Sequence, residues 1–225
     1  MKKTIILSFA VTAFLISCKG STGDKTVTTD AQEVAAQTGA SYNVNKEQSD
    51  LKWKGYHKGG LNPRFGTLKT DGTVSVDNGA VTGGTFTIEI KTIATDEASV
   101  DPVTSGGKTA ADLTGHLLSA DFFESDVYPT ASFEITSVAP FDAASGESVV
   151  ADANSLVSGN LTIKDKTVNV TFPARITVSG DNVNIFSQFA INRQDWGLTY
   201  GAEGDPADWM ISQEVDIELN VNATK

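Results

Sequence analysis

The chain is poor in the residues that carry most enzyme chemistry: it has one cysteine and two histidines in 225 residues. With Cys18 alone, no intramolecular disulfide can form. His57 and His116 lie in different segments, and neither has the short, regular spacing to other ligands that is typical of metal sites. The sequence has no Gly-x-Ser-x-Gly motif, and its glycine pairs lack the Lys and Ser/Thr of a phosphate loop. These absences argue against an enzyme and predict neither a cofactor nor a metal.

Basic residues are also scarce, with 17 Lys and Arg against 28 Asp and Glu. Loss of an N-terminal signal would remove Lys2 and Lys3 but no acid, leaving 15 basic residues and a formal charge of −13. Such a charge repels phosphate backbones and anionic head groups. We therefore expect no nucleic-acid binding, and an affinity for lipids that changes little with ionic strength.

The N-terminus has the pattern of an export signal. Met1-Lys2-Lys3 is basic, and the run from Thr4 to Ile16 is apolar and uncharged but shorter than the ~20 residues that span a bilayer. Leu15-Ile16-Ser17-Cys18 matches the lipobox of bacterial lipoproteins, in which the cysteine is diacylated and becomes the new N-terminus. The sequence predicts a signal peptide over 1–17 and a membrane anchor at Cys18, because two acyl chains make a stable anchor.

Residues 18–41 are rich in Ser, Thr, Gly, Ala, Gln and Asp, a composition typical of flexible linkers. A free coil of that length would span roughly 25 Å. Lys19 follows the cysteine where, in enteric bacteria, an Asp would retain a lipoprotein at the inner membrane. We expect an outer-membrane lipoprotein on the periplasmic face or the cell surface, and a homodimer is left open.

The rest of the chain, 42–225, is long enough for one domain and is dominated by a period of two. Apolar and polar residues alternate in about eight segments, each with one apolar face. Turn residues such as Asp77-Asn78-Gly79 and Lys164-Asp165-Lys166 separate them. The segments lie around Leu51–Trp53, Thr73–Val76, Phe86–Ile90, Ala131–Ile135, Val157–Ile163, Val168–Val178, Val183–Ile191 and Val215–Val221.

Between Thr95 and Pro129 the period changes: Ala110, Leu113 and Leu117 fall at helical spacing. The expected fold is all-β with one short helix in a long inter-strand segment. Eight hairpin-connected strands can bury their apolar faces by stacking two sheets or by closing a barrel, and periodicity does not decide between them.

Arg193-Gln194-Asp195-Trp196-Gly197 directly follows an apolar strand. An Arg–Asp pair could close the rim of the sheet while Trp196 fills the core. Alternatively, Arg193 could donate to the polar head of an apolar ligand. His116, in the expected helix, could equally hydrogen-bond nearby backbone or contact a ligand.

Several motifs together resemble the YceI-like family of lipid-binding or polyisoprenoid-binding periplasmic proteins. They occur in the family's order from about Tyr42 to the C-terminus, whereas the segment from Ser99 to Ala111 departs from the family pattern. The motifs are Leu51-Lys52-Trp53-Lys54-Gly55, Gly83-Gly84-Thr85-Phe86-Thr87-Ile88, His116-Leu117-Leu118-Ser119-Ala120-Asp121-Phe122-Phe123, Tyr128-Pro129-Thr130-Ala131-Ser132-Phe133, Gly159-Asn160-Leu161-Thr162-Ile163-Lys164 and Arg193-Gln194-Asp195-Trp196-Gly197.

The resemblance implies an antiparallel eight-stranded, lipocalin-like barrel around a cavity for an isoprenoid tail, quinone or related lipid. A barrel of that size either is filled by its own side chains or holds one small ligand. The residues expected to contact the ligand are Phe86, Phe133, Phe172, Ile185, Phe189, Phe122, Phe123, Arg193, Trp196 and His116.

The expected function is therefore sequestration or transport of an apolar lipid, with Cys18 holding the barrel at the membrane. Two alternatives remain at this point. One is a surface lipoprotein with a solid barrel that meets a protein partner. The other is an enzyme acting on an isoprenoid lipid through His116 or Asp195, which would need a polar group aimed into the cavity.

Overall fold

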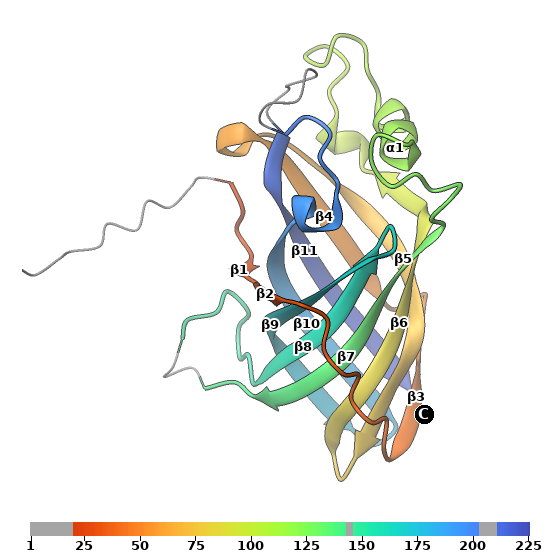
Figure 1. Cartoon of the computed structure of the whole chain (residues 1–225), viewed down its shortest axis with the longest axis vertical. Helices are drawn as coiled ribbons and strands as arrows, with labels where there is room; N and C mark the ends of the chain where they lie inside the picture. The colour runs from red at the N-terminus through yellow and green to blue at the C-terminus, as the bar shows by residue number, and fades with distance from the viewer. Residues whose placement is uncertain (1–19, 143–145, 203–210) are drawn as a thin grey trace, which may run out of the picture.

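The alternating segments form long strands in the computed structural model, which describes residues 20–142, 146–202 and 211–225 (Figure 1). The connections between strands include one α-helix, α1 (Ala110–Leu118), and three short 3-10 helices, η1 (Lys58–Gly60), η2 (Glu97–Ser99) and η3 (Arg193–Trp196). The strands are β1 (Asp24–Lys25), β2 (Val27–Thr29), β3 (Ala40–Val44), β4 (Asp50–His57), β5 (Leu61–Asp77), β6 (Ala80–Thr95), β7 (Thr130–Pro140), β8 (Ser155–Ile163), β9 (Lys166–Ser179), β10 (Asn182–Asn192) and β11 (Ile211–Thr224).

The sheet closes on itself. Strands β5 to β11 are neighbours in chain order, all antiparallel, and both β3 and β4 pair with β5 on one side and β11 on the other. Because β3 and β4 share one position, the closed barrel has eight strands. The prediction of an all-β, eight-stranded antiparallel barrel with one short helix is confirmed.

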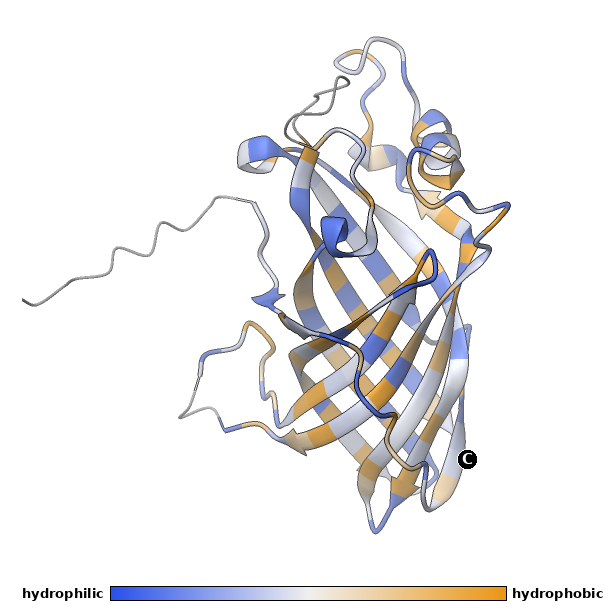
Figure 2. Ribbon diagram, viewed as in Figure 1, coloured by the Kyte–Doolittle hydropathy of each residue, from blue (hydrophilic) through white to orange (hydrophobic). Residues whose placement is uncertain are grey.

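The period of two sorts side chains between the inside and the outside of the barrel. Along β10, Val183, Ile185 and Phe189 are each 6% exposed or less. Figure 2 shows the same alternation of apolar and polar residues along the strands. The apolar faces of the barrel strands, β3 to β11, thus point to one common core.

The tight turns have the backbone that their sequences predict. Asn78 and Gly79 between β5 and β6 have φ of 50° and 80°, and Lys164 and Asp165 between β8 and β9 have 49° and 59°. Two consecutive residues with positive φ form the two-residue hairpin turn that matches the twist of antiparallel strands.

Helix α1 covers one end of the barrel (Figure 1). It begins with a capping box, in which Thr109 and Asp112 each accept a hydrogen bond from the other's backbone N–H. Thr114 in the helix donates to Thr95 at the end of β6, with 2.9 Å between their hydroxyl oxygens. The helix therefore has a fixed place above the apolar interior.

The segment expected to be a free linker is instead bound to the barrel in its described part, and the expectation was wrong there. Residues 20–39, here called the N-terminal strap, cross the outside of the wall (Figure 1, red). In chain order the strap contacts β11, β10, β9, β8, β7 and β6. Composition did not reveal this because the contacts use backbone groups and small polar side chains, which a flexible coil also contains.

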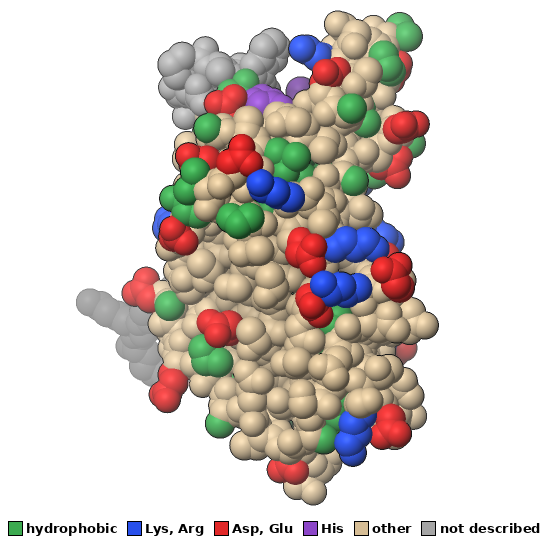
Figure 3. All heavy atoms as spheres, turned by 90° about the vertical axis from the view of Figure 1, so that its right-hand side faces the viewer, with side chains coloured by type: hydrophobic (Ala, Val, Ile, Leu, Met, Phe, Trp, Pro, Cys, Tyr) green, Lys and Arg blue, Asp and Glu red, His purple; other side chains and the backbone are tan. Residues whose placement is uncertain are grey.

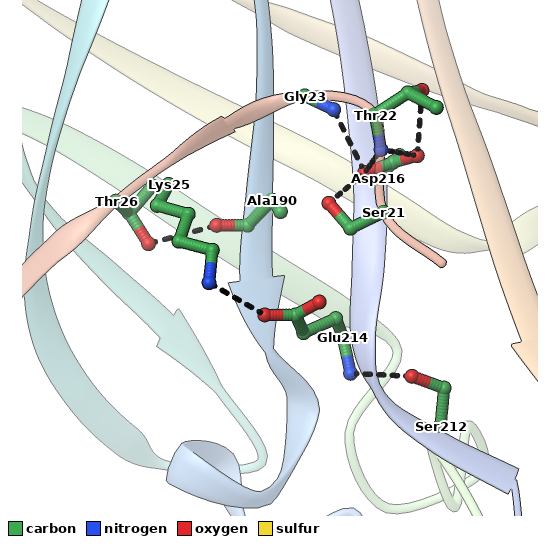
Figure 4. A network of polar contacts seen from close by, with 9 residues as sticks. All are labelled: Ser21, Thr22, Gly23, Lys25, Thr26, Ala190, Ser212, Glu214 and Asp216. Carbon is green, nitrogen blue, oxygen red and sulfur yellow. Dashed lines mark hydrogen bonds and ion pairs between the residues drawn. The ribbon is translucent and has the colours of Figure 1, made fainter. Parts of the chain in front are cut away.

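Asp216 on the outer face of β11 holds the start of the strap (Figure 4). Its carboxylate accepts hydrogen bonds from Ser21 Oγ at 2.6 Å, from the N–H of Thr22 at 3.0 Å and from the N–H of Gly23 at 3.2 Å. The hydroxyl of Tyr56 donates to the same carboxylate at 2.7 Å. Gly23 allows the close approach, because a Cβ there would fall 2.6 Å from the carbonyl carbon of Phe189.

The strap lies over a break in the barrel wall. Strands β9 and β10 pair from Ser179 and Asn182 only as far as Arg175 and Phe186. Beyond that point Pro173 offers no N–H, and its carbonyl accepts from Ser187 Oγ at 2.6 Å. Here β1 pairs with β10, and β2 pairs with β9. The strap thus covers the seam where the two strands separate.

The outer surface is polar and mixed in charge. On the face shown in Figure 3, basic side chains lie beside acidic ones. Lys46, for example, is 3.0 Å from carboxylate oxygens of both Asp71 and Glu89. In the part of the chain that is described, no helix has the length and apolarity needed to cross a membrane.

Candidate functional site

An apolar cavity of about 320 Å³ occupies the inside of the barrel. Its walls are the inner faces of strands β4 to β11, and Leu113 and Leu117 of α1 line it at one end. Ligand pockets typically measure about 300–1,000 Å³, so the space is large enough for one small ligand. The described barrel is therefore hollow rather than filled by its own side chains.

Four phenylalanines from four strands form a continuous row across the interior. The ring centroids of Phe86 and Phe133 are 6.2 Å apart, and those of Phe133 and Phe172 are 5.9 Å apart. Phe172 and Phe189 stack at 4.0 Å with an interplanar angle of 7°. The last pair joins β9 to β10 on the inside of the seam, opposite the strap.

Glycine on β8 makes room for this row. Phe133 lies against Gly159, where a Cβ would fall only 2.2 Å from Phe133 Cζ. Any side chain at this position would push the ring into the cavity. The shape of the cavity thus depends on a residue that contributes no side chain of its own.

Of the ten residues expected to contact a ligand, eight line the cavity. They come from β6, β7, β9 and β10, from the segment after α1 and from η3, so closure of the barrel brings together residues far apart in sequence. The eight are Phe86, Phe133, Phe172, Ile185, Phe189, Phe122, Phe123 and Arg193.

The structure does not bring the other two, Trp196 and His116, to the cavity lining. Trp196 is 2% exposed, and its indole N–H donates to the carbonyl oxygen of Leu161 at 2.9 Å. It fills the core behind the cavity wall, as the structural interpretation of this motif predicted. His116 packs edge-on against Phe122 and Tyr200, with centroids 5.1 and 4.8 Å away.

Arg193 is a buried cation in the cavity wall. It is 4% exposed, and burial lowers the pKa of its guanidinium. Nε donates to the carbonyl of Ser212 at 2.9 Å, Nη2 to that of Ile211 at 3.1 Å, and Nη1 to that of Leu198. Within the described ranges it makes no ion pair with Asp195, so the expected Arg–Asp pair is not formed.

The lining residues that were not anticipated as site residues include Trp53, His57 and Arg64. Trp53 is 9% exposed, and its indole nitrogen has no hydrogen-bond partner in the described part of the chain. The alternation that places Leu51 and Trp53 inside continues to His57, a signal that could have identified the histidine. Arg64 follows a proline and has no comparable sequence signal.

Neither of the residues considered for catalysis, His116 and Asp195, lines the cavity. His116 Nε2 is 2.9 Å from Asp121 Oδ2, but Asp121 is 53% exposed and neither residue lines the cavity. No group of His, Cys, Asp and Glu suited to a metal ion occurs among the described residues. An enzyme would need a proton carrier aimed into the cavity, and this pair does not supply one.

Comparisons with known proteins agree with this architecture. The chain is 30% identical over 150 residues to Protein YceI of Shigella flexneri and of Escherichia coli O157:H7, covering 63% of this chain and 70% of each relative.

Among solved structures, Burkholderia cenocepacia BcnA aligns with a TM-score of 0.57 at 20% identity, over 80% of this chain and 99% of BcnA. A polyisoprenoid binding domain from Saccharophagus degradans aligns with a TM-score of 0.56 at 16% identity, over 85% and 99%. At such identities these structures show a shared fold. Residues 42–223 match the YceI-like domain, and the chain belongs to that family.

Proposed function

We propose that this protein is an envelope lipoprotein that binds an elongated apolar ligand, a polyisoprenoid, isoprenoid quinone or related lipid, inside its barrel for sequestration or transport. The observation that carries the proposal is the apolar cavity of about 320 Å³ with its row of phenylalanines. The Saccharophagus degradans domain of the same fold is a polyisoprenoid binding domain, which supports the same ligand class here.

The hydrophobic effect is sufficient to drive such binding. Each methylene group moved from water into an apolar cavity contributes about 0.8 kcal/mol, so roughly ten of them contribute about 8 kcal/mol before the cost of association. No catalytic group is required. The protein would act by keeping an insoluble chain out of water.

Thermal unfolding with and without a prenyl quinone tests the proposal, because a ligand that binds only the folded state raises the unfolding midpoint. Ala131 lines the cavity on β7, and Ser132 beside it points outward. Ala131→Trp should fill the cavity and abolish the ligand-dependent shift, whereas Ser132→Trp on the same strand should retain it. If no isoprenoid or fatty acyl compound stabilises the parent protein, the binding proposal fails and an interaction role for the barrel gains support.

The anchor is a separate part of the proposal and rests on Leu15-Ile16-Ser17-Cys18, which lies outside the described residues. Cys18→Ser should abolish lipidation and either block signal processing or release soluble protein. Cell fractionation and mass spectrometry of the N-terminus measure both results. A processed Cys18→Ser variant that remained in the outer membrane like the parent would refute the anchor.

A further inference from the structure

Basic side chains gather at one end of the cavity, although the chain as a whole is acidic. His57, Arg64 and Arg193 all line it. The carboxylate among the lining residues, Asp50, is at the opposite end of β4 from His57, about 23 Å away along the strand. The cavity therefore has an apolar body and one end that is rich in positive charge.

Backbone pairing brings two of these groups together. His57 on β4 is the strand partner of Ile211 on β11, and the carbonyl oxygen of Ile211 accepts the hydrogen bond from Arg193 Nη2. The backbone of His57 and the guanidinium of Arg193 thus both lie beside Ile211, and they come from different elements, β4 and η3.

Arg64 joins them from the neighbouring strand. It is the partner of Gly55 on β4, which has no side chain to occupy the interior at that level. Its Nη1 donates to the carbonyl of Ser99 in η2, close to the end of the barrel that α1 covers. Burial and then the charge of Arg64 lower the pKa of His57, which places the two side chains in one electrostatic environment.

These cations have no anionic partner in the described part of the chain: no carboxylate lies within 4.0 Å of Arg64 or Arg193. A guanidinium carries five N–H donors, and Arg193 uses three on backbone carbonyls. A carboxylate or phosphate that matches the guanidinium fork would supply acceptors for the remaining donors together with a negative charge.

We infer that the end of the cavity lined by His57, Arg64 and Arg193 is a head-group site for an oxyanion, the carboxylate or phosphate of a single-chain amphiphile whose tail fills the apolar body. The inference rests on the proposed function and narrows its ligand class from apolar lipids in general to those with an acidic head group. It also changes what we expect from the net charge of the chain, because two guanidinium groups in the cavity wall, Arg64 and Arg193, can bind an anion even within an acidic protein.

Matched ligands separate the head group from the tail. Binding of hexadecanoic acid and hexadecanol, and of farnesyl phosphate and farnesol, is measured by displacement of a fluorescent fatty acid. We expect each acid to bind at least tenfold more tightly than its alcohol. The two acids together show whether the site prefers a carboxylate or a phosphate.

Arg64→Met is the informative variant, because Arg193 also supports the chain at Leu198 and Ile211 and its loss could prevent folding. Arg64→Met should weaken acid binding about tenfold and leave alcohol binding unchanged. Arg175→Met is the matched control, since Arg175 lies over the ring of Phe186, which does not line the cavity. It removes the same charge and should change neither affinity.

The outcomes distinguish the two proposals. Equal affinities of acids and alcohols for the parent, or equal weakening of both by Arg64→Met, would overturn the head-group site while leaving lipid binding intact. No binding of acid, alcohol or prenyl quinone would overturn the proposed function together with this inference.

Discussion

The contact between Asp216 and the N-terminal strap gives a prediction whose size follows from the structure. Four donors of the strap point at this one carboxylate. They are the hydroxyl of Ser21, the hydroxyl and the N–H of Thr22, and the N–H of Gly23. Asp216→Ala removes the acceptor for all of them. At about 0.5–1 kcal/mol for each half-exposed hydrogen bond, attachment of the strap should weaken by about 2–4 kcal/mol.

Tryptic cleavage after Lys25 measures this change. Lys25 has an 82% exposed side chain, but its backbone pairs with β10, so the protease must wait for the strap to detach. Where detachment is fast relative to cleavage, the rate follows the detached population. A loss of about 2–4 kcal/mol should therefore speed cleavage by a factor of roughly 30 to 700.

Glu214→Ala is the control on the same strand. Glu214 contacts the strap through an ion pair with Lys25 at 3.9 Å, and such surface pairs contribute about 0–1 kcal/mol. Cleavage should accelerate fivefold at most in this variant. If both variants speed cleavage equally, the carboxylate of Asp216 does not hold the strap, and the pairing of β1 and β2 is sufficient.

The remaining predictions concern pH and the cavity wall. Burial raises the pKa of Asp216, but the hydrogen bonds that its carboxylate accepts outweigh burial and leave that pKa below its usual value. The contribution of Asp216 to attachment of the strap should therefore be complete above about pH 4 and should be lost as pH falls through the folded-state pKa. Hydrogen exchange of the strap's backbone amides, measured across this pH range, should show this loss in the parent and not in Asp216→Ala. Phe172→Ala should lower the free energy of unfolding by about 3 kcal/mol in urea titrations, at the low end for a buried Phe because the ring already borders open space. Gly159→Ala should destabilise by about 1–3 kcal/mol and reduce lipid binding, because the new Cβ pushes Phe133 into the cavity; unchanged binding would contradict the described packing.

Local sequence determined which residues face the interior, because a strand's side chains alternate with a fixed period. Phe86, Phe133, Phe172 and Phe189 were placed in the core on that basis, and all four line the cavity. The two-residue turns were equally predictable, since residues such as Asn78 and Gly79 tolerate positive φ. Helix α1 was predictable from its spacing of leucines, though the direction of His116 was not.

Closure of the barrel decided what periodicity left open. Whether eight apolar faces stack as two sheets or close into a barrel depends on pairing between β4 and β11, more than 150 residues apart for Trp53 and Ile217. The same long-range pairing brings His57 next to Ile211 and thus toward Arg193. No local pattern encodes such a meeting, because it depends on the register of strands from opposite ends of the domain.

The N-terminal strap shows the limit of composition most clearly. Ser21, Thr22 and Gly23 have the composition of a linker, and in isolation they would be one. They bind because folding places Asp216 on the outside of β11 and because Pro173 ends the pairing of β9 with β10, which leaves a seam to cover. The sequence determined which face of each strand is apolar and where the chain turns. The tertiary structure decided where β9 and β10 separate, and therefore where the N-terminal strap binds to cover their unpaired backbone groups.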